Sequence, residues 1–283
     1  MEVLNVSNVG ARGPAADEAA PYWIWPLRLP PSARRATYDF AGLAEAFCAG
    51  WRWVPASIAA GTIPFLVSYA TGAPGHQLIS ALLLMMLCLA CARRDDWRKG
   101  LGVMALAYVA HCAVVIALSY ADPARVAPLL PGAADYWHKQ IGWIQTGTDP
   151  EYQLSAWVPA HLKLLGGALL FSYTSLGAII FYQGFFEVDL MNFYNAQLMA
   201  ESSNQALSLA LGWHVWSWLR GLGYLFIAFE IISFSLRRMT GLSGDVGLRW
   251  RRFGVGLAFL LADGLVKVIM LEPVREQMLF NLK

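Results

Sequence analysis

Asp263 and Lys267 are the two residues whose types and spacing most directly suggest chemistry. They lie four positions apart in the apolar stretch 259–267, so in a helix their side chains share one face and can reach each other. If this helix crosses a bilayer, an unpaired charge at its centre costs roughly 2.5–3.5 kcal/mol. The two charges must therefore meet each other, another helix or water. They form either a proton, ion or substrate site or a neutralised packing pair.

A second candidate site is the segment 213–224, which combines three tryptophans with His214 and Arg220. Together with Trp216, these residues are suited to binding a lipid headgroup, a quinone or a haem propionate, because the planar guanidinium matches anionic oxygens. The alternative is an aromatic belt at the membrane interface, with Arg220 extended towards lipid phosphates.

Glu230 lies ten residues beyond Arg220, too far along one helix for the two to pair. Its partner is therefore expected on another helix. Lys267 is the natural candidate, which predicts a polar centre in which Glu230 joins Asp263 and Lys267.

His111 is a further titratable residue within an apolar stretch. A single histidine at membrane depth most often makes a hydrogen bond to a backbone carbonyl or a serine. His111 and His214 are also candidate axial ligands of a b-type haem, although nothing else in the sequence calls for one. Glu187 and Asp189 do not share a helix face, and we interpret them as the solvated end of a helix.

An aspartate four residues before a lysine in the last helix resembles the retinal-binding helix of microbial rhodopsins. The resemblance rests on Asp263 and Lys267. It implies a retinal Schiff base on Lys267, with Asp263 as part of its counterion. The chain departs from that family in having six expected helices rather than seven, and in offering no carboxylate or arginine over 101–120 to complete the counterion. No cofactor and no metal site is therefore predicted.

The composition identifies the elements that must position these groups. Residues 54–92 contain no Asp, Glu, Lys or Arg, and hydrophobic residues make up 57% of the chain against 14% charged. Soluble domains carry about 25% charged residues. The pattern predicts an all-α, polytopic integral membrane helix bundle. A net charge of +2 gives no reason to expect a nucleic-acid partner.

The membrane domain is expected to span residues 37–283, with about six transmembrane helices. A preceding tail, residues 1–36, is expected to be disordered and cytoplasmic, without a cleavable signal peptide. Phe40, Leu43, Phe47 and Trp51 recur at helical spacing and predict an interfacial amphipathic helix. The six spanning helices are expected at 54–71, 76–92, 101–120, 164–186, 206–236 and 253–271.

The charged run 93–99 predicts a cytoplasmic turn in a multi-pass protein of the cell membrane, the inner membrane in a bacterium. The connection 122–156 is then an extracytoplasmic cap, with a short helix over 133–144. The arginines between 237 and 252 also predict a cytoplasmic loop, but six helices would place them outside. A break within 206–236 would resolve this conflict, because about 46 Å of helix is too long for one crossing and too short for two.

No sequence motif specifies a reaction, since nucleotide-binding loops, HExxH and GxSxG motifs and dinucleotide fingerprints do not occur. The first hypothesis is a non-enzymatic permease, a channel-like protein or a subunit of a membrane complex. The alternatives are a redox or lipid-processing enzyme subunit that binds haem or quinone through His111 and His214, and a structural scaffold. Expected partners are the lipid bilayer and other membrane subunits or a second copy of the chain.

Overall fold

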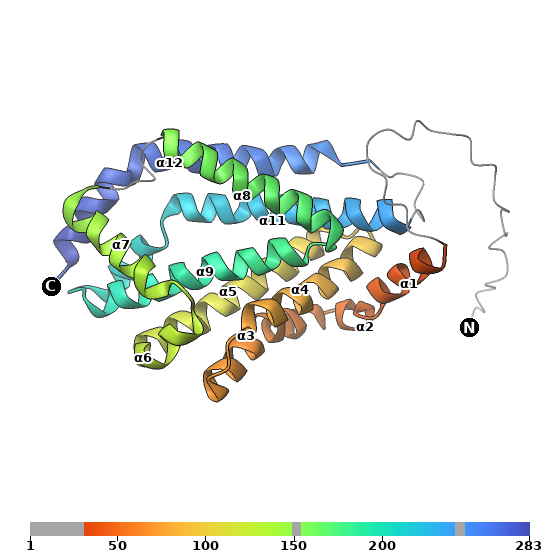
Figure 1. Cartoon of the computed structure of the whole chain (residues 1–283), viewed down its shortest axis with the longest axis horizontal. Helices are drawn as coiled ribbons and strands as arrows, with labels where there is room; N and C mark the ends of the chain where they lie inside the picture. The colour runs from red at the N-terminus through yellow and green to blue at the C-terminus, as the bar shows by residue number, and fades with distance from the viewer. Residues whose placement is uncertain (1–30, 149–153, 241–246) are drawn as a thin grey trace, which may run out of the picture.

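The computed structural model describes residues 31–148, 154–240 and 247–283. Their regular structure is helical, apart from one isolated β-bridge between Ser202 and Leu282 (Figure 1). The helices in chain order are α1 (Pro31–Gly42), α2 (Glu45–Cys48), α3 (Trp53–Thr71), α4 (His76–Arg93), α5 (Trp97–Ala121), α6 (Pro123–Val126), the 3-10 helix η1 (Ala127–Leu129), α7 (Ala133–Thr146), α8 (Leu154–Thr174), α9 (Ala178–Ala200), α10 (Gln205–Gly212), α11 (Val215–Thr240) and α12 (Trp250–Asn281).

Five of these helices, α3, α4, α5, α11 and α12, are long and apolar enough to cross a membrane. The expected class, an all-α polytopic membrane bundle, is thereby confirmed. On α12 the outward side chains are large and apolar, and Leu261, Leu265 and Ile269 are 68–73% exposed. Such a face suits lipid. The polar residues Asp263 and Lys267 lie on the buried side of the same helix.

Helix α9 lies in the middle of the bundle and packs against α4, α5, α7, α8 and α10 (Figure 1). It is not among the five strongly apolar helices. Its buried residues include Asp189, Asn192 and Asn195. A polar helix at this position is enclosed by protein, where its side chains can find partners that lipid does not offer.

The bundle has two apolar cores. One lies where α2, α4, α5 and α11 meet, and its members include Leu84, Met104 and Phe229. The other joins α7 to α9 and α12, and its members include Ile144 and Tyr194. The polar residues of α9 lie along the helix that connects these two cores.

The expected helix over 164–186 is wrong, because the chain turns inside it. Helix α8 ends at Thr174 and α9 begins at Ala178. Gly177 in the turn has φ +94°, and a Cβ there would collide with the side chain of Ile232. This turn creates a hairpin of two helices where the sequence predicted one. Each later helix therefore runs through the bundle in the direction opposite to the one expected from six helices.

The hairpin resolves the conflict over the arginine-rich segments. Arg249 Nη1 lies 2.7 Å from Asp95 Oδ2, so the connection between α11 and α12 meets the turn between α4 and α5. We call this the basic end of the bundle, and the opposite end, with α6, η1 and α7, the cap end. The stretch 206–236 is also broken as predicted, because α10 ends at Gly212 and α11 begins at Val215.

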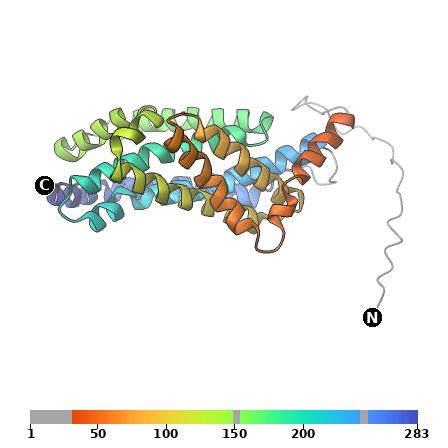
Figure 2. The same ribbon diagram turned by 90° about the horizontal axis from the view of Figure 1, so that it is seen from below.

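The N-terminal region agrees in part with expectation. Residues 1–30, which include most of the expected tail, lie outside the described residues, whereas 31–36 belong to α1 rather than to a disordered segment. The amphipathic stripe points outward, since Leu43, Phe47 and Trp51 are 59–74% exposed. Cys48 and its buried neighbours pack on α4 instead. Helix α1, drawn in red, lies at the end of the bundle far from the C-terminus (Figure 2).

The cap contains a short helix where one was expected, and this helix is α7. Two of its tryptophans, Trp137 and Trp143, are only 9% and 4% exposed and belong to the core near α9 and α12. The cap is therefore fixed to the bundle by buried indoles.

A buried histidine–aspartate triad as candidate functional site

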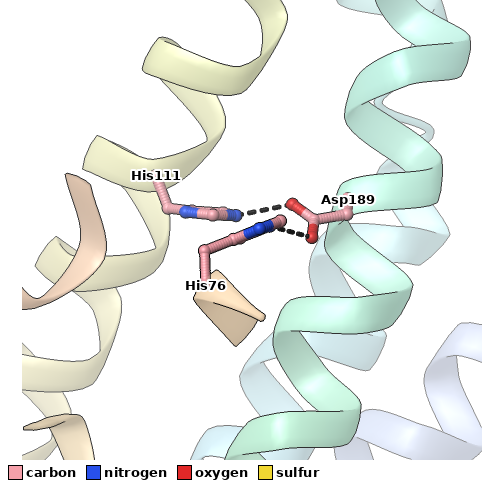
Figure 3. A group of neighbouring side chains, drawn as sticks. All are labelled: His76, His111 and Asp189. Carbon is pink, nitrogen blue, oxygen red and sulfur yellow. Dashed lines mark hydrogen bonds and ion pairs between the residues drawn. The ribbon is translucent and has the colours of Figure 1, made fainter. Parts of the chain in front are cut away.

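Three buried side chains from three helices meet inside the bundle (Figure 3). His76 is the first residue of α4, directly after the turn 72–75; His111 lies in the middle of α5; Asp189 lies in the middle of α9. None of the three is more than 1% exposed. We call them the triad.

The Asp189 carboxylate is the hub of the triad. Its Oδ1 lies 2.7 Å from His111 Nε2, and its Oδ2 lies 2.8 Å from His76 Nε2. Gln77 Nε2 donates a hydrogen bond of 2.8 Å to the same Oδ2. Each carboxylate oxygen is thus held by a separate imidazole, and the amide fixes the orientation of the carboxylate.

The second nitrogen of His111 also has a partner. His111 Nδ1 lies 2.7 Å from the backbone carbonyl oxygen of Gly61 on α3. A carbonyl only accepts, so Nδ1 is the donor of this hydrogen bond. His111 Nε2, which faces the Asp189 carboxylate, can then either donate a hydrogen bond to it or ligate a metal ion.

The surroundings of the triad are apolar and aromatic. The rings of Phe65 and Phe185 meet the His111 ring edge to face at 5.8 and 4.9 Å, and Phe65 also meets the His76 ring at 4.9 Å. These phenylalanines belong to the two different cores. The triad therefore lies between the cores, where electrostatic interactions are strong because water is excluded.

The triad has the donor set of a transition-metal site. One ligand atom from each of His76, His111 and Asp189 lies within 4.8 Å of the others. Two imidazoles and one carboxylate are a common ligand set for zinc and for non-haem iron. Metal-bound histidines usually donate their other ring N–H to a carbonyl or carboxylate, which His111 does here.

The interpretation of Asp189 as part of a solvated helix end is wrong. Asp189 lies well inside α9 and is buried. The signal that could have revealed it is the recurrence of Asp189, Asn192 and Asn195 every three residues, which predicts one polar helix face. His76 and Gln77 gave a second signal, since they open an otherwise apolar helix.

Among the residues predicted from sequence, Asp263 and Arg220 are brought together. Arg220 Nε and Nη2 donate to the two Asp263 oxygens at 2.9 and 3.3 Å. The Asp263 side chain is 2% exposed and that of Arg220 is 26% exposed. Lys267 is buried one turn further along α12. Arg220 and Asp263 thus form an ion pair between α11 and α12, and a binding role for these residues stays a prediction.

His214 and Trp216 are neighbours at the break before α11. Their rings stack at 4.3 Å, and the Trp143 ring meets His214 edge to face at 5.9 Å. His214 Nε2 is buried and makes no hydrogen bond. His214 is thus packed between an indole of its own segment and one of the cap, and its role in ligand binding stays a prediction.

Glu230 does not belong to this polar centre, contrary to the predicted cluster with Lys267. Glu230 accepts a hydrogen bond of 3.1 Å from Arg237 Nη2 and one of 2.8 Å from the backbone nitrogen of Arg249. The reason is its position: Glu230 lies in the half of α11 that approaches the basic end, where the backbone of Arg249, just before α12, reaches it.

Haem ligation by His111 and His214 stays a prediction from the sequence. The chain matches no family model, no curated protein and no solved structure. The triad must therefore be interpreted from its own geometry.

Proposed function

We propose that this protein is an integral membrane metalloprotein that binds one divalent transition-metal ion, of the zinc class, through His76 Nε2, His111 Nε2 and Asp189. The observation that carries the proposal is the convergence of one ligand atom from each of the three residues within 4.8 Å. The Gly61 carbonyl would hold the His111 imidazole in the ligating tautomer.

A divalent ion would leave a net charge of +1 at the triad, because Asp189 supplies one negative charge and the two histidines ligate as neutral groups. An anionic fourth ligand such as hydroxide would neutralise this charge. Three protein ligands are the number found in catalytic zinc sites, where a fourth position takes water or substrate. This arrangement fits a metal-dependent enzyme and also a permease that carries the metal itself.

The first experiment is metal analysis of the full chain purified in detergent. We expect about one equivalent of zinc, iron or cobalt per chain after incubation with the metal and desalting. His76→Ala, His111→Ala and Asp189→Asn should each lose most of it. Bound Co²⁺ should give visible absorption bands whose intensity indicates four-coordinate geometry.

Matched controls are available on α7. His138→Ala and Asp135→Asn replace exposed residues of the same types and should leave the metal content unchanged. Retention of a full equivalent by all three triad variants would refute the proposal. So would a wild-type chain that folds but binds none of these metals at micromolar concentration.

A second candidate function is a proton-coupled permease, in which the triad holds a proton instead of a metal. The contacts of 2.7 and 2.8 Å favour it, because they are ordinary hydrogen-bond lengths. It also agrees with the permease hypothesis drawn from the sequence. Under this function the wild-type chain binds no metal, whereas proton uptake by proteoliposomes is present in the wild type and lost in Asp189→Asn.

A further inference from the structure

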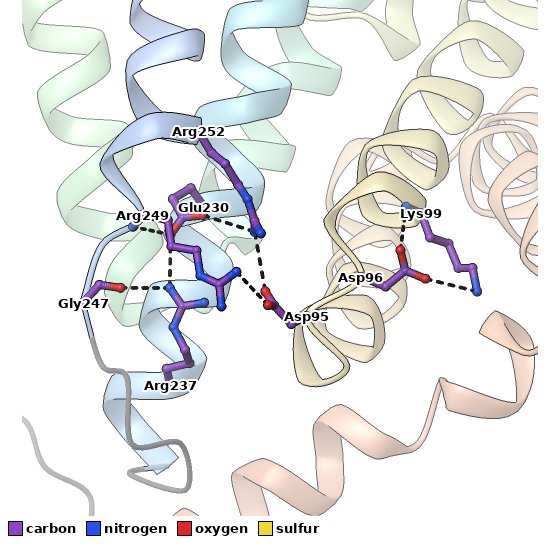
Figure 4. A network of polar contacts seen from close by, with 8 residues as sticks. All are labelled: Asp95, Asp96, Lys99, Glu230, Arg237, Gly247, Arg249 and Arg252. Carbon is purple, nitrogen blue, oxygen red and sulfur yellow. Dashed lines mark hydrogen bonds and ion pairs between the residues drawn. The ribbon is translucent and has the colours of Figure 1, made fainter.

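Five charged residues join the two loops at the basic end (Figure 4). They are Asp95 in the α4–α5 turn, Glu230 and Arg237 on α11, and Arg249 and Arg252 at the start of α12. We call them the arginine cluster. Three guanidinium groups face two carboxylates, so the cluster keeps one excess positive charge.

Glu230 occupies the interior of the cluster and is fully buried. It is held by Arg237 Nη2 at 3.1 Å and by the backbone nitrogen of Arg249 at 2.8 Å. Arg237 Nη2 also donates to the Gly247 carbonyl at 3.0 Å. These bonds account for one Glu230 oxygen and one Arg237 nitrogen.

The charged groups in the outer part of the cluster make fewer hydrogen bonds. Arg249 Nη1 pairs with Asp95 at 2.7 Å, but Arg252 Nη1 stands 3.5 Å from Asp95 and 3.9 Å from Glu230. Arg252 Nη1 and Arg237 Nε are both buried and make no hydrogen bond. Arg237 as a residue is 9% exposed.

Buried guanidinium N–H groups without acceptors are costly, and each calls for an explanation such as a ligand. Glu230 Oε2 is also buried without a hydrogen bond, but the positive excess of the cluster favours an anionic ligand. Guanidinium groups present parallel N–H donors that match the oxygens of a phosphate. Basic sites between helices on the cytoplasmic side are suited to anionic lipid headgroups.

We propose that the arginine cluster binds a phosphate group, with Arg252 and Arg237 supplying the N–H donors that the protein leaves unused. The phosphate belongs either to an anionic lipid headgroup or to a soluble phosphate compound. This proposal is independent of the metal site, since the cluster and the triad share no residue.

The test is thermal unfolding of the full chain in nanodiscs. Neutral phosphatidylcholine discs are titrated with inorganic phosphate against chloride at equal ionic strength. Separately, phosphatidylglycerol discs are compared with phosphatidylcholine discs. We expect the midpoint temperature to rise by several degrees with at least one phosphate source. A rise with phosphatidylglycerol alone identifies the lipid headgroup, and a rise with inorganic phosphate alone identifies a soluble ligand.

Arg252→Gln should abolish the rise, whereas Arg251→Gln, a change at the exposed neighbour, should keep it. Arg252→Lys covers the case in which the glutamine variant does not fold, because it preserves the charge beside Asp95 but not the parallel donors. It should lose at least about half of the rise. Equal rises in the wild type and Arg252→Lys, or no rise in either comparison, would overturn the proposal.

Discussion

His111 Nδ1 and the carbonyl oxygen of Gly61 lie 2.7 Å apart and join α5 to α3 beside the triad. The contact depends on how closely the two helices approach, because a Cβ at position 61 would overlap the backbone carbonyl of Ala107. Glycine is the residue that permits this approach. The orientation of one metal-ligand candidate is therefore set by a backbone group on a neighbouring helix.

Gly61→Ala should destabilise the bundle and disturb the triad. The added methyl group forces α3 away from α5, and overpacking of this kind costs about 1–3 kcal/mol. Thermal unfolding in detergent measures the loss. The control is Gly254→Ala on α12, where a Cβ would meet no atom within 4 Å. Equal stability of the two variants would show that the helices separate without cost.

Arg220 and Asp263 should be energetically coupled. Arg220→Met or Asp263→Leu alone removes this ion pair, and loss of one member of a fully buried pair costs about 3–5 kcal/mol. We expect a smaller loss here, because Arg220 is 26% exposed. The double variant should recover much of the stability, because two apolar side chains suit this interface. A double-mutant cycle on the unfolding midpoint measures the coupling, and additive effects would contradict it.

Thr146 and Arg98 should lie on opposite sides of the membrane. Thr146 ends α7 at the cap end, and Arg98 is the second residue of α5 at the basic end. By the positive-inside rule, Thr146→Cys should react with an impermeant thiol reagent on intact cells, and Arg98→Cys only after permeabilisation. The wild-type chain gives the background labelling, since Cys48, Cys88 and Cys91 are buried and Cys112 is half-buried. The reverse labelling pattern would invert the proposed orientation.

Asn281 should fix α10 against the end of α12. Its amide nitrogen donates to the Asn204 carbonyl at 2.9 Å and to Ser208 Oγ at 2.6 Å, and its Oδ1 accepts from the Asn204 backbone nitrogen at 3.0 Å. Asn281→Ala should accelerate proteolysis between α9 and α10 and lower stability by about 1–3 kcal/mol. Gln277→Ala, a change at an exposed residue of the same helix, should have little effect.

The helical membrane class could be predicted because it depends on long apolar runs, and three of the expected helices agree with α3, α4 and α5 to within a few residues. The hairpin of α8 and α9 could not be predicted from the sequence. Its turn at 175–177 lies inside a continuous apolar pattern, and the polar half of α9 resembles a loop when neighbouring helices are unknown.

Of the two candidate sites, likewise, one could be predicted from the sequence and the other could not. The Asp263 face of α12 was predictable from charges spaced along one helix. The triad was not, because His76, His111 and Asp189 are separated by 35 and 78 positions in the sequence. A histidine alone in an apolar helix, such as His111, gives no indication of its partner until the packing of α4, α5 and α9 is known.

The polarity of α9 has a consequence for the biogenesis of the protein. A segment with Asp189, Asn192 and Asn195 in its middle partitions poorly into lipid by itself, because each polar side chain adds an unfavourable transfer free energy. It must enter the bilayer together with its hairpin partner α8, or after α4 and α5 have formed a surface to receive it. Replacement of His76 or His111 would then already impair the protein during its synthesis. Helix α9 would be retained at the insertion machinery, and the chain would be degraded.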